Sequence, residues 1–228
     1  MNTISLLTGL RFVDSFFPSG SYAFSSGLEA AVQGGQARTV EEFARYVKDL
    51  LDGSISRREA VAVARAWEAQ AGCAVTAAMD TDHELDSMIL CSEIRAASRQ
   101  MGRQVIRMAA EGRMGAAMMR EFCSTVDNER TPGHFPVCIG LTLGVAGWGR
   151  AETVAAFLYQ TAVSFVSAGM KLLPLGQRDG QRLLNLWTPW IAQVADNIQP
   201  DDPLCGWSPV QEIYAMRHAR LESRLFRS

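Results

Sequence analysis

The residues with the clearest chemical potential form an acidic run from Asp80 to Asp86 that includes His83. Clustered carboxylate oxygens are the ligands that hard divalent cations prefer, so one interpretation is the metal site of an all-α hydrolase. The other interpretation places these acids in the first turn of a helix, where carboxylates interact favourably with the positive end of the helix dipole. Asp80 or Asp82 then caps the helix. We favour the second, because no other acidic cluster completes a metal site.

A serine- and glycine-rich segment, residues 17–29, is the next candidate. A serine nucleophile needs a base within hydrogen-bond reach, and the histidines of the chain, His83, His134 and His218, lie far away in sequence. The sequence also has no Gly-x-Ser-x-Gly motif and no Gly-x-x-x-x-Gly-Lys phosphate loop. We therefore expect a protein that is not an enzyme, with residues 17–29 forming a recognition loop.

Four arginines recur every four residues, at positions 95, 99, 103 and 107. On a helix they share one broad face, and like charges at this spacing destabilise the helix by roughly a few tenths of a kcal/mol per pair. Acidic groups must offset that repulsion. Arg99 and Arg103 are therefore candidate residues for binding an acidic partner, with intramolecular ion pairs or a solvated face as the alternative.

Two further segments place polar residues beside apolar helical patterns. In residues 168–181, Lys171 lies at the end of an apolar pattern, and a Pro-Leu-Gly turn leads into a polar step. Polar loops of this kind often carry function. In the tail, residues 216–228, two leucines and Phe226 form an apolar edge among arginines. A helix this short is marginal alone, so it either docks on the domain or is ordered by a partner.

Composition narrows the class of protein. The net charge of −2 over 228 residues gives no electrostatic drive for binding nucleic acid. Five scattered cysteines without a Cys-x-x-Cys pair are typical of the reducing cytoplasm, and the N-terminus lacks the basic start of a signal peptide. Of two uncharged windows, only residues 153–170 are long enough to cross a membrane, and their polar residues favour a buried helix of a soluble protein.

Helical periodicity runs through nearly the whole chain. Thr39 and Glu42 form a capping box before one amphipathic segment, and Gly140 and Gly144 favour close packing of another. We expect one all-α domain of about ten helices spanning residues 1–228, with 208–228 as a C-terminal partner-binding helix and tail. The main expected helices cover about 26–34, 40–51, 56–71, 80–110, 114–126, 137–148, 153–170 and 179–197.

Together these segments resemble the urease accessory protein F (UreF) family over essentially the whole chain. The loop matches a Pro-x-Gly-Ser-Tyr pattern followed by Ser-x-Gly-Leu-Glu, and the second segment matches Lys-x-x-Pro-Leu-x-Gln-x-Asp-Gly-Gln. The chain ends in Ser-Arg-Leu-Phe-Arg-Ser with His218 upstream, and Arg99 to Arg103 resembles the family's Arg-x-x-Gly-Arg region. The matching residues of the first two segments are Pro18, Gly20, Ser21, Tyr22, Ser25, Gly27, Leu28, Glu29, Lys171, Pro174, Leu175, Gln177, Asp179, Gly180 and Gln181.

The resemblance implies a cytoplasmic, homodimeric chaperone of nickel-enzyme maturation that is not itself an enzyme. Members of the family bind the urease accessory protein D, also called H, and with it recruit the GTPase accessory protein G to load nickel into apo-urease. By this resemblance, Lys171 and the step from Gln177 to Gln181 lie near the surface that meets the GTPase. The terminal helix helps to grip the D/H partner.

The resemblance also assigns the individual site residues. Those for partner binding are Lys171, Pro174, Leu175, Gln177, Asp179, Gly180, Gln181, Arg99, Arg103, His218, Leu221, Arg224, Leu225 and Phe226. Tyr22 and Cys205 would lie near a path for nickel, with no tightly bound cofactor. Many members carry a loop histidine where this chain has Ala23, Phe24 and Ser26, which leaves Cys205 as the softer candidate ligand. A single thiol is a poor tight site for nickel or zinc, so we expect transit of nickel rather than storage. A generic dimerisation module without a link to urease is the remaining alternative.

Overall fold

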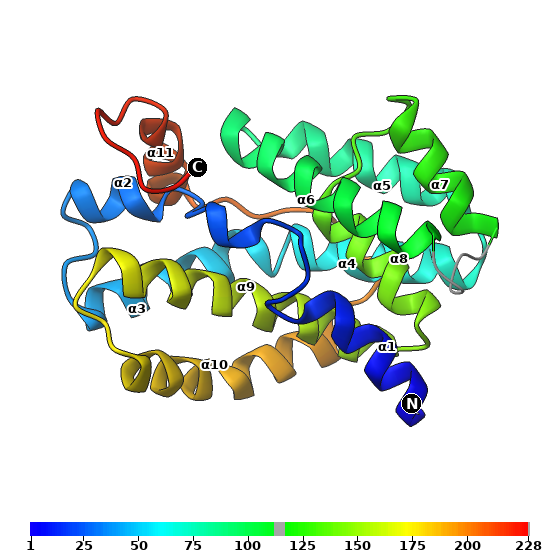
Figure 1. The fold of residues 1–228 in the computed structure, drawn as a ribbon, viewed down its shortest axis with the longest axis horizontal. Helices are drawn as coiled ribbons and strands as arrows, with labels where there is room; N and C mark the ends of the chain where they lie inside the picture. Colours follow the sequence, from blue (N-terminus) through cyan, green and yellow to red (C-terminus); the bar gives the residue numbers. More distant parts are fainter. Residues whose placement is uncertain (112–116, 228) are drawn as a thin grey trace.

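The computed structural model describes residues 1–111 and 117–227 (Figure 1). Within these residues the chain forms eleven α-helices and no strand, which confirms the all-α class and adds one helix to the number expected. The helices are α1 (Thr3–Val13), α2 (Leu28–Gln33), α3 (Val40–Leu50), α4 (Glu59–Ala71), α5 (Val75–Met88), α6 (Ser92–Glu111), α7 (Ala117–Asp127), α8 (Phe135–Val145), α9 (Arg150–Leu172), α10 (Gln177–Asn197) and α11 (Pro209–His218).

Helix α8 lies at the centre of the fold, packed between α4 and α6. Its apolar residues surround the whole helix, as expected for a helix that is buried on every side. A Cβ atom at Gly140 would lie 2.6 Å from the Val63 carbonyl oxygen of α4, and one at Gly144 would lie 2.7 Å from Gln70 Oε1. The close packing predicted for these two glycines is therefore confirmed.

Helices α9 and α10 run side by side along one edge of the molecule (Figure 1). Of the described helices, α9 is the one that is long and apolar enough to cross a membrane, and half of that apolar window is buried within the fold. A Cβ at Gly180 would lie 2.7 Å from Val166 Cγ1, so α10 begins in close contact with α9. This pairing fixes the turn that follows Lys171.

The helix predicted from Asp80 to about Ala110 is wrong in its boundaries. Helix α5 already begins at Val75 and ends at Met88, and three non-helical residues precede α6. Ile89 is buried in extended backbone at this break, because burial of its side chain overrides the local helical pattern. The acidic run therefore lies inside α5, and neither Asp80 nor Asp82 caps a helix. The predicted start of the next helix, residues 114–116, lies outside the described residues.

The local caps follow the sequence more closely. Thr39 Oγ1 accepts a hydrogen bond from the Glu42 amide at 3.2 Å, and Glu42 in turn accepts from the Arg38 amide at 2.8 Å. These bonds confirm the capping box predicted for α3. Helix α2 starts at Leu28 rather than near Ser26, and its N-cap residue, Gly27, makes no side-chain cap bond; Ser25 Oγ accepts a hydrogen bond from the Glu29 amide at 3.4 Å just before it.

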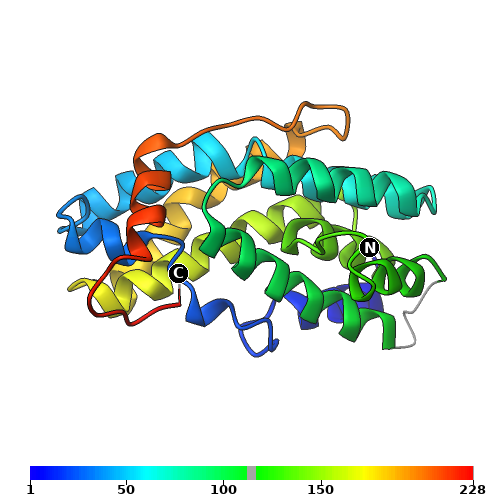
Figure 2. The ribbon, with the colours of Figure 1, turned by 90° about the horizontal axis from the view of Figure 1, so that it is seen from above.

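The end of the chain returns to its beginning. Residues 198–208 cross the outside of the fold and lead into α11 (Figure 2), which packs on α2 and α6. Helix α11 ends at His218, and residues 219–227 run on without helix. Phe226 is buried. Of the two alternatives for the tail, the structure shows the docked one.

Candidate partner-binding site

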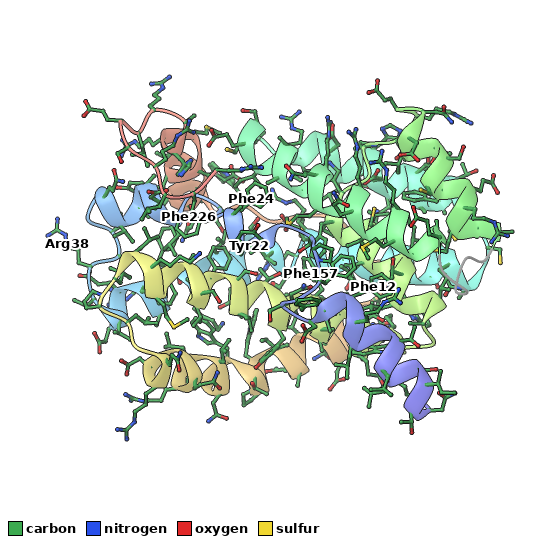
Figure 3. The ribbon with its side chains drawn as sticks, in the orientation of Figure 1. Phe12, Tyr22, Phe24, Arg38, Phe157 and Phe226 are labelled. Atoms are coloured by element: carbon green, nitrogen blue, oxygen red, sulfur yellow. The ribbon has the colours of Figure 1, made fainter. Side chains whose placement is uncertain are left out.

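The three segments that stand out in the sequence meet on one surface. Tyr22, Phe24 and Phe226 lie close together above α9 (Figure 3). The Arg227 amide donates to the Ala23 carbonyl oxygen at 2.8 Å, and Lys171 Nζ lies 5.2 Å from the centre of the Phe226 ring. We call this the docking surface: the loop 17–27, the Lys171 end of α9 and the tail 219–227.

Glu29 is the anchor of the tail. Its side chain is buried, with 2% relative exposure. Glu29 Oε1 accepts a hydrogen bond from the Leu225 amide at 2.7 Å, and Oε2 accepts from the Phe226 amide at 3.1 Å. A buried carboxylate needs such donors to offset its lost hydration. One glutamate from the recognition motif therefore fixes the backbone of the tail.

His218 connects the same anchor to α6. Its Nε2 lies 3.1 Å from Glu29 Oε2, and its Nδ1 lies 2.9 Å from Glu93 Oε2. Arg224 of the tail donates to the other oxygen of Glu93 at 3.0 Å. The ring of His218 is fully buried. A single ionic network thus joins α2, α6, α11 and the tail.

Gly27 allows α2 and α11 to come this close. Its φ is +84°, in the region that favours glycine. A Cβ there would lie only 2.6 Å from the Cα of Ala215 in α11. The glycine of the Ser-x-Gly-Leu-Glu pattern is therefore required both for its backbone conformation and for close packing.

A groove of about 270 Å³ runs between the loop and α9. Tyr22, Tyr159, Lys171 and the edge of Phe226 line it, and Tyr22 is 75% exposed. Aromatic side chains that are exposed beside a cation are typical of contact residues in protein interfaces. The groove is thus the most suitable contact site on the docking surface.

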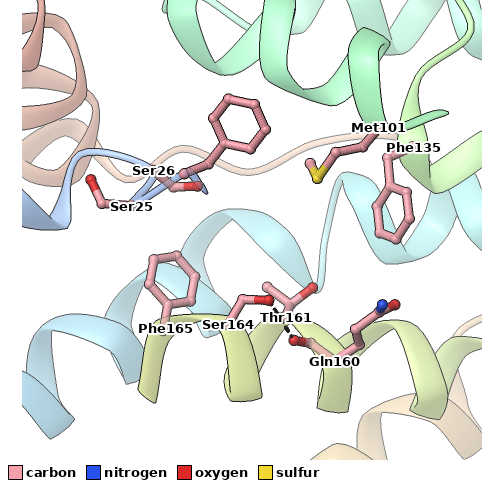
Figure 4. Close-up of a pocket in the computed structure, with 9 residues that line it drawn as sticks. Ser25, Ser26, Met101, Phe135, Gln160, Thr161, Ser164 and Phe165 are labelled. Atoms are coloured by element: carbon pink, nitrogen blue, oxygen red, sulfur yellow. Dashed lines mark hydrogen bonds between the residues drawn. The ribbon is translucent and has the colours of Figure 1, made fainter. Parts of the chain in front are cut away.

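A smaller cavity of about 90 Å³ (Figure 4) shares Phe24, Gln160 and Ser164 with the lining of the groove. Phe135, Phe165 and Met101 supply its apolar wall. Gln160 lines both spaces, and its Oε1 is buried without a hydrogen-bond partner. The loop therefore packs over a small cavity rather than directly on a close-packed core.

The segment that begins at Lys171 divides into packing and contact residues. Leu175 and Gly180 are buried, and they hold the turn against α9. Lys171, Pro174, Gln177 and Gln181 are exposed, and Asp179 is half-buried beside Arg182, 3.7 Å from its guanidinium. Only the exposed members can touch a partner directly.

The arginine row has acidic partners within the chain. Arg99 donates to Asp86 of α5, and Arg107 donates to Asp127 of α7 at 2.7 Å. Arg103 is half-buried, and its Nε has no hydrogen-bond partner. The alternative of intramolecular ion pairs therefore holds for Arg99 and Arg107, and Arg103 keeps free donor capacity.

The acidic run serves the fold. Asp82 is fully buried and accepts hydrogen bonds from Thr131 Oγ1 at 2.7 Å and from the amides of Gly133 and His134 at 2.5 and 2.8 Å. Asp86 binds Arg99 and His134 Nε2. These two carboxylates hold the turn before α8 and have little capacity left for a metal ion.

The pKa shifts agree with that structural role. Burial lowers the pKa of His134 and outweighs the opposing effects of Asp82 and Asp86, so the ring is neutral near pH 7. Partial burial raises the pKa of Asp86, but the hydrogen bonds from His134 and Arg99 outweigh it and the net shift is downward. His134 Nδ1 lies 3.0 Å from the Ser98 hydroxyl, which can donate to a neutral ring.

The two residues predicted to lie on a nickel path line separate spaces. Tyr22 lines the groove on the docking surface, and Cys205 lines a cleft between α10 and residues 202–205. Among the described residues no three His, Cys, Asp or Glu side chains come together in a metal-binding group. The structure does not bring Tyr22 and Cys205 into one site.

Three residues of this arrangement have no role in the sequence-based predictions: Glu93 and His134 have none, and Glu29 is only part of a motif. Asp82 is predicted to cap a helix, but it holds the turn before α8 instead. The only local sign of Glu29 in the sequence is that an acidic residue follows an apolar one at the start of a short helix. Glu93 gives no local signal, because its partners lie 125 and 131 residues away in the chain.

Comparisons with known proteins identify the relatives of the chain. A family model described as UreF matches residues 37–186. The chain is 30% identical to the urease accessory protein UreF of Xanthobacter autotrophicus, over 99% of this chain and 92% of that protein. It is 30% identical to the protein of the same name from Actinobacillus pleuropneumoniae serotype 3, over 96% of this chain and 97% of that protein. A Bacillus relative with the same name is 27% identical over 98% of this chain and 99% of that protein.

Proposed function

Because the chain belongs to the UreF family of urease accessory proteins, we propose that it is a non-catalytic adaptor in urease maturation. It bridges the accessory protein D/H and the GTPase accessory protein G while nickel is inserted into apo-urease in the cytoplasm. The observation that carries this proposal is the docking surface, on which the recognition loop, Lys171 and the tail meet. The buried acids of α5, which serve the fold, count against the alternative of a metal-dependent hydrolase.

The D/H partner binds the terminal helix and the tail. Helix α11 exposes Val210, Ile213 and Met216 at helical spacing, and Trp207 precedes them with 67% exposure. Leu225 on the tail is also exposed, whereas Phe226 is held against the domain. An exposed apolar stripe of this kind is typical of a helix that packs on another protein.

The GTPase partner binds the corner between α9 and α10. Lys171 is one of the exposed cations of this corner, together with Arg178 and Arg182 of α10. Lys48 is the other lysine in the chain. Replacing Lys171 by alanine should raise the dissociation constant for the GTPase about 5- to 30-fold, because truncating a charged contact at an interface typically costs about 1–2 kcal/mol. Titration calorimetry with the assembled D/H complex measures the change.

Lys48→Ala is the matched control for Lys171→Ala. Lys48 forms an ion pair with Asp52, and its Nζ lies 4.1 Å from the Trp190 ring centre. Neither Asp52 nor Trp190 belongs to the docking surface. It should bind the GTPase like the wild type. If Lys171→Ala binds unchanged, or both variants weaken binding equally, the corner is not the GTPase site.

The chain forms a homodimer through α1. The outer face of α1 exposes Ile4 and Leu7, and Phe16 beyond it is 95% exposed, while Gly9 and Phe12 face the core. Leu7→Asp should shift the protein toward the monomer in light scattering, because a charge would be buried without a partner. Leu186→Asp, a change at an equally exposed leucine of α10, should leave the mass unchanged. A wild-type monomer at all concentrations would refute the homodimer.

Nickel is cargo of the complex rather than a resident cofactor of this chain. Tyr22 and Cys205 remain the residues proposed to lie near its route, and a lone thiol is a weak site for nickel or zinc.

The decisive experiment for the whole proposal is urease activation in cells that lack their own F protein. Restored activation supports the adaptor, whereas a generic dimerisation module would restore nothing.

A further inference from the structure

A cavity of about 140 Å³, which we call the inner cavity, lies where side chains of α4, α6, α8, α9 and α11 meet. Most of its wall is apolar and comes from Ile55, Ile94, Phe135, Phe157 and Phe165. A dry apolar cavity of about 150 Å³ holds one benzene molecule. The inner cavity is therefore large enough for a ligand whose apolar body has that size.

The inner cavity continues toward the docking surface. It shares Ser26, Met101, Phe135, Thr161 and Phe165 with the smaller cavity of about 90 Å³, in which Met101 of α6 and Thr161 of α9 face each other (Figure 4). The smaller cavity shares residues with the groove in turn. These shared residues place the three spaces in a row that leads inward from the surface.

The inner cavity also has polar atoms that no protein group satisfies. Ser54, with 1% relative exposure, and Glu59, with a side chain that is 14% exposed, both line it. Ser54 Oγ and Glu59 Oε2 are buried, and neither has a hydrogen-bond partner. A carboxylate oxygen only accepts hydrogen bonds, and leaving it unpaired in a buried site is costly. The group that completes this site is therefore a hydrogen-bond donor.

The charge beside these atoms favours a cation. Among the described residues that line the inner cavity, the charged ones are Arg58, Glu59 and Glu212. The guanidinium of Arg58 donates to Glu59 Oε1 at 2.9 Å and to the Met88 carbonyl oxygen at 3.1 Å, and it lies 3.6 Å from Glu212 Oε1. Two carboxylates against one guanidinium leave one negative charge in excess. An anionic ligand would be repelled.

An organic ammonium fits these features better than a metal ion does. Its three N–H groups donate, and it has no lone pair that would face the carboxylate of Glu59. A metal ion needs several ligand groups around it. In the part of the chain that the structure describes, no three His, Cys, Asp or Glu side chains come together to supply them.

We propose that the inner cavity binds a small primary amine in its ammonium form. The ammonium group lies on Glu59, and an apolar body about the size of a benzene ring lies among the aromatic side chains. Because Gln211 and Glu212 of α11 line the same cavity, a bound amine stabilises the packing of α11 on the domain. The effect on partner binding rests on the proposed function, but binding of the amine does not.

The test uses benzylamine and the full-length free protein, with ¹³C-labelled methionine methyl groups observed by NMR near neutral pH. Benzylamine should shift the Met101 signal saturably, with a dissociation constant of about 1 mM or lower. The signal of Met118, which does not line the cavity, should stay unchanged. Benzyl alcohol has a similar shape without the charge and should bind at least about tenfold more weakly, because hydrogen bonds between charged groups are stronger than neutral ones. Benzoate should not bind.

Three results in the wild type would overturn the proposal: no saturable shift of Met101 with benzylamine, equal affinity for benzyl alcohol, or binding of benzoate. These comparisons need no variant, so they decide even if a substitution prevents folding. They also need no partner protein. A failure of the adaptor function therefore cannot imitate a failure of amine binding.

Two variants locate the amine in the cavity. Glu59→Gln keeps the size of the side chain but removes its charge, so benzylamine should bind at least about tenfold more weakly while benzyl alcohol changes by less than about threefold. Thr161→Leu adds bulk to the wall that both cavities share and should weaken the binding of both ligands. Glu68→Gln, at an exposed glutamate of α4, is the matched control for Glu59→Gln and should bind like the wild type. Unchanged benzylamine binding in Glu59→Gln or in Thr161→Leu would contradict the assignment.

Discussion

Replacing Glu29 by alanine should release the C-terminal tail from the body of the protein. The change removes the acceptor of the Leu225 and Phe226 amides and one of the two carboxylate contacts of His218. Breaking a buried charged pair from one side costs about 3–5 kcal/mol, which corresponds to at least about a hundredfold loss of tail protection. Hydrogen exchange at residues 225 and 226 measures it directly.

The effect of Glu29→Ala on global stability should be smaller than its effect on the tail. Residues 219–227 form no helix and lie at the end of the chain, so they can detach while the core stays folded, and the total loss cannot exceed the free energy of docking. Glu222→Ala, at an exposed glutamate of the same tail, is the control and should keep protection within about twofold. Normal tail protection in Glu29→Ala would show that the anchor is elsewhere.

Replacing Asp82 by alanine should destabilise the whole domain. Asp82 is fully buried and holds the turn before α8 through Thr131, Gly133 and His134. The change leaves three buried donors without an acceptor, at about 1–3 kcal/mol each. They cannot reach water without disturbing the central helix, so a loss of about 3–5 kcal/mol is expected in the free energy of unfolding. For a chain of this size that lowers the melting temperature by roughly 10 °C, measurable by circular dichroism.

Asp80→Ala is the control for Asp82→Ala, because Asp80 is exposed on the same helix. Its melting temperature should stay within about 2 °C of the wild type. If Asp82→Ala is equally stable, the turn before α8 is held by other contacts, and the acids of α5 become available for another role.

The burial of Asp82 also decides how the hydrolase alternative can be tested. An Asp82 variant would lose function through unfolding whether or not the chain were an enzyme. The informative change is Asp80→Asn together with Glu84→Gln, since Asp80 is exposed and Glu84 makes a surface pair with Arg65 that contributes little to stability. The adaptor predicts normal urease activation by this double variant, and the hydrolase predicts its loss.

Much of the fold could be predicted from the sequence, because its signals are local. Apolar spacing predicts the helices, Thr39 and Glu42 mark the start of α3, and the two glycines of α8 indicate close packing. Each of these signals lies within one or two helical turns. The break at Ile89 could not be predicted because the helical spacing of apolar residues continues through it. Burial of Ile89 in the folded core overrides that spacing.

The sequence by itself determined the all-α class and the three segments of the UreF pattern, since both depend on residue types at short spacings. Only the tertiary structure decided that these segments form one surface. Glu29 and His218 are 189 residues apart, and Glu93 and Arg224 are 131 residues apart. Contacts at such separations arise when the helices pack, and no local spacing encodes them. The same packing places Asp82 of the acidic run against the turn before α8, so the run supports the central helix rather than forming a metal site.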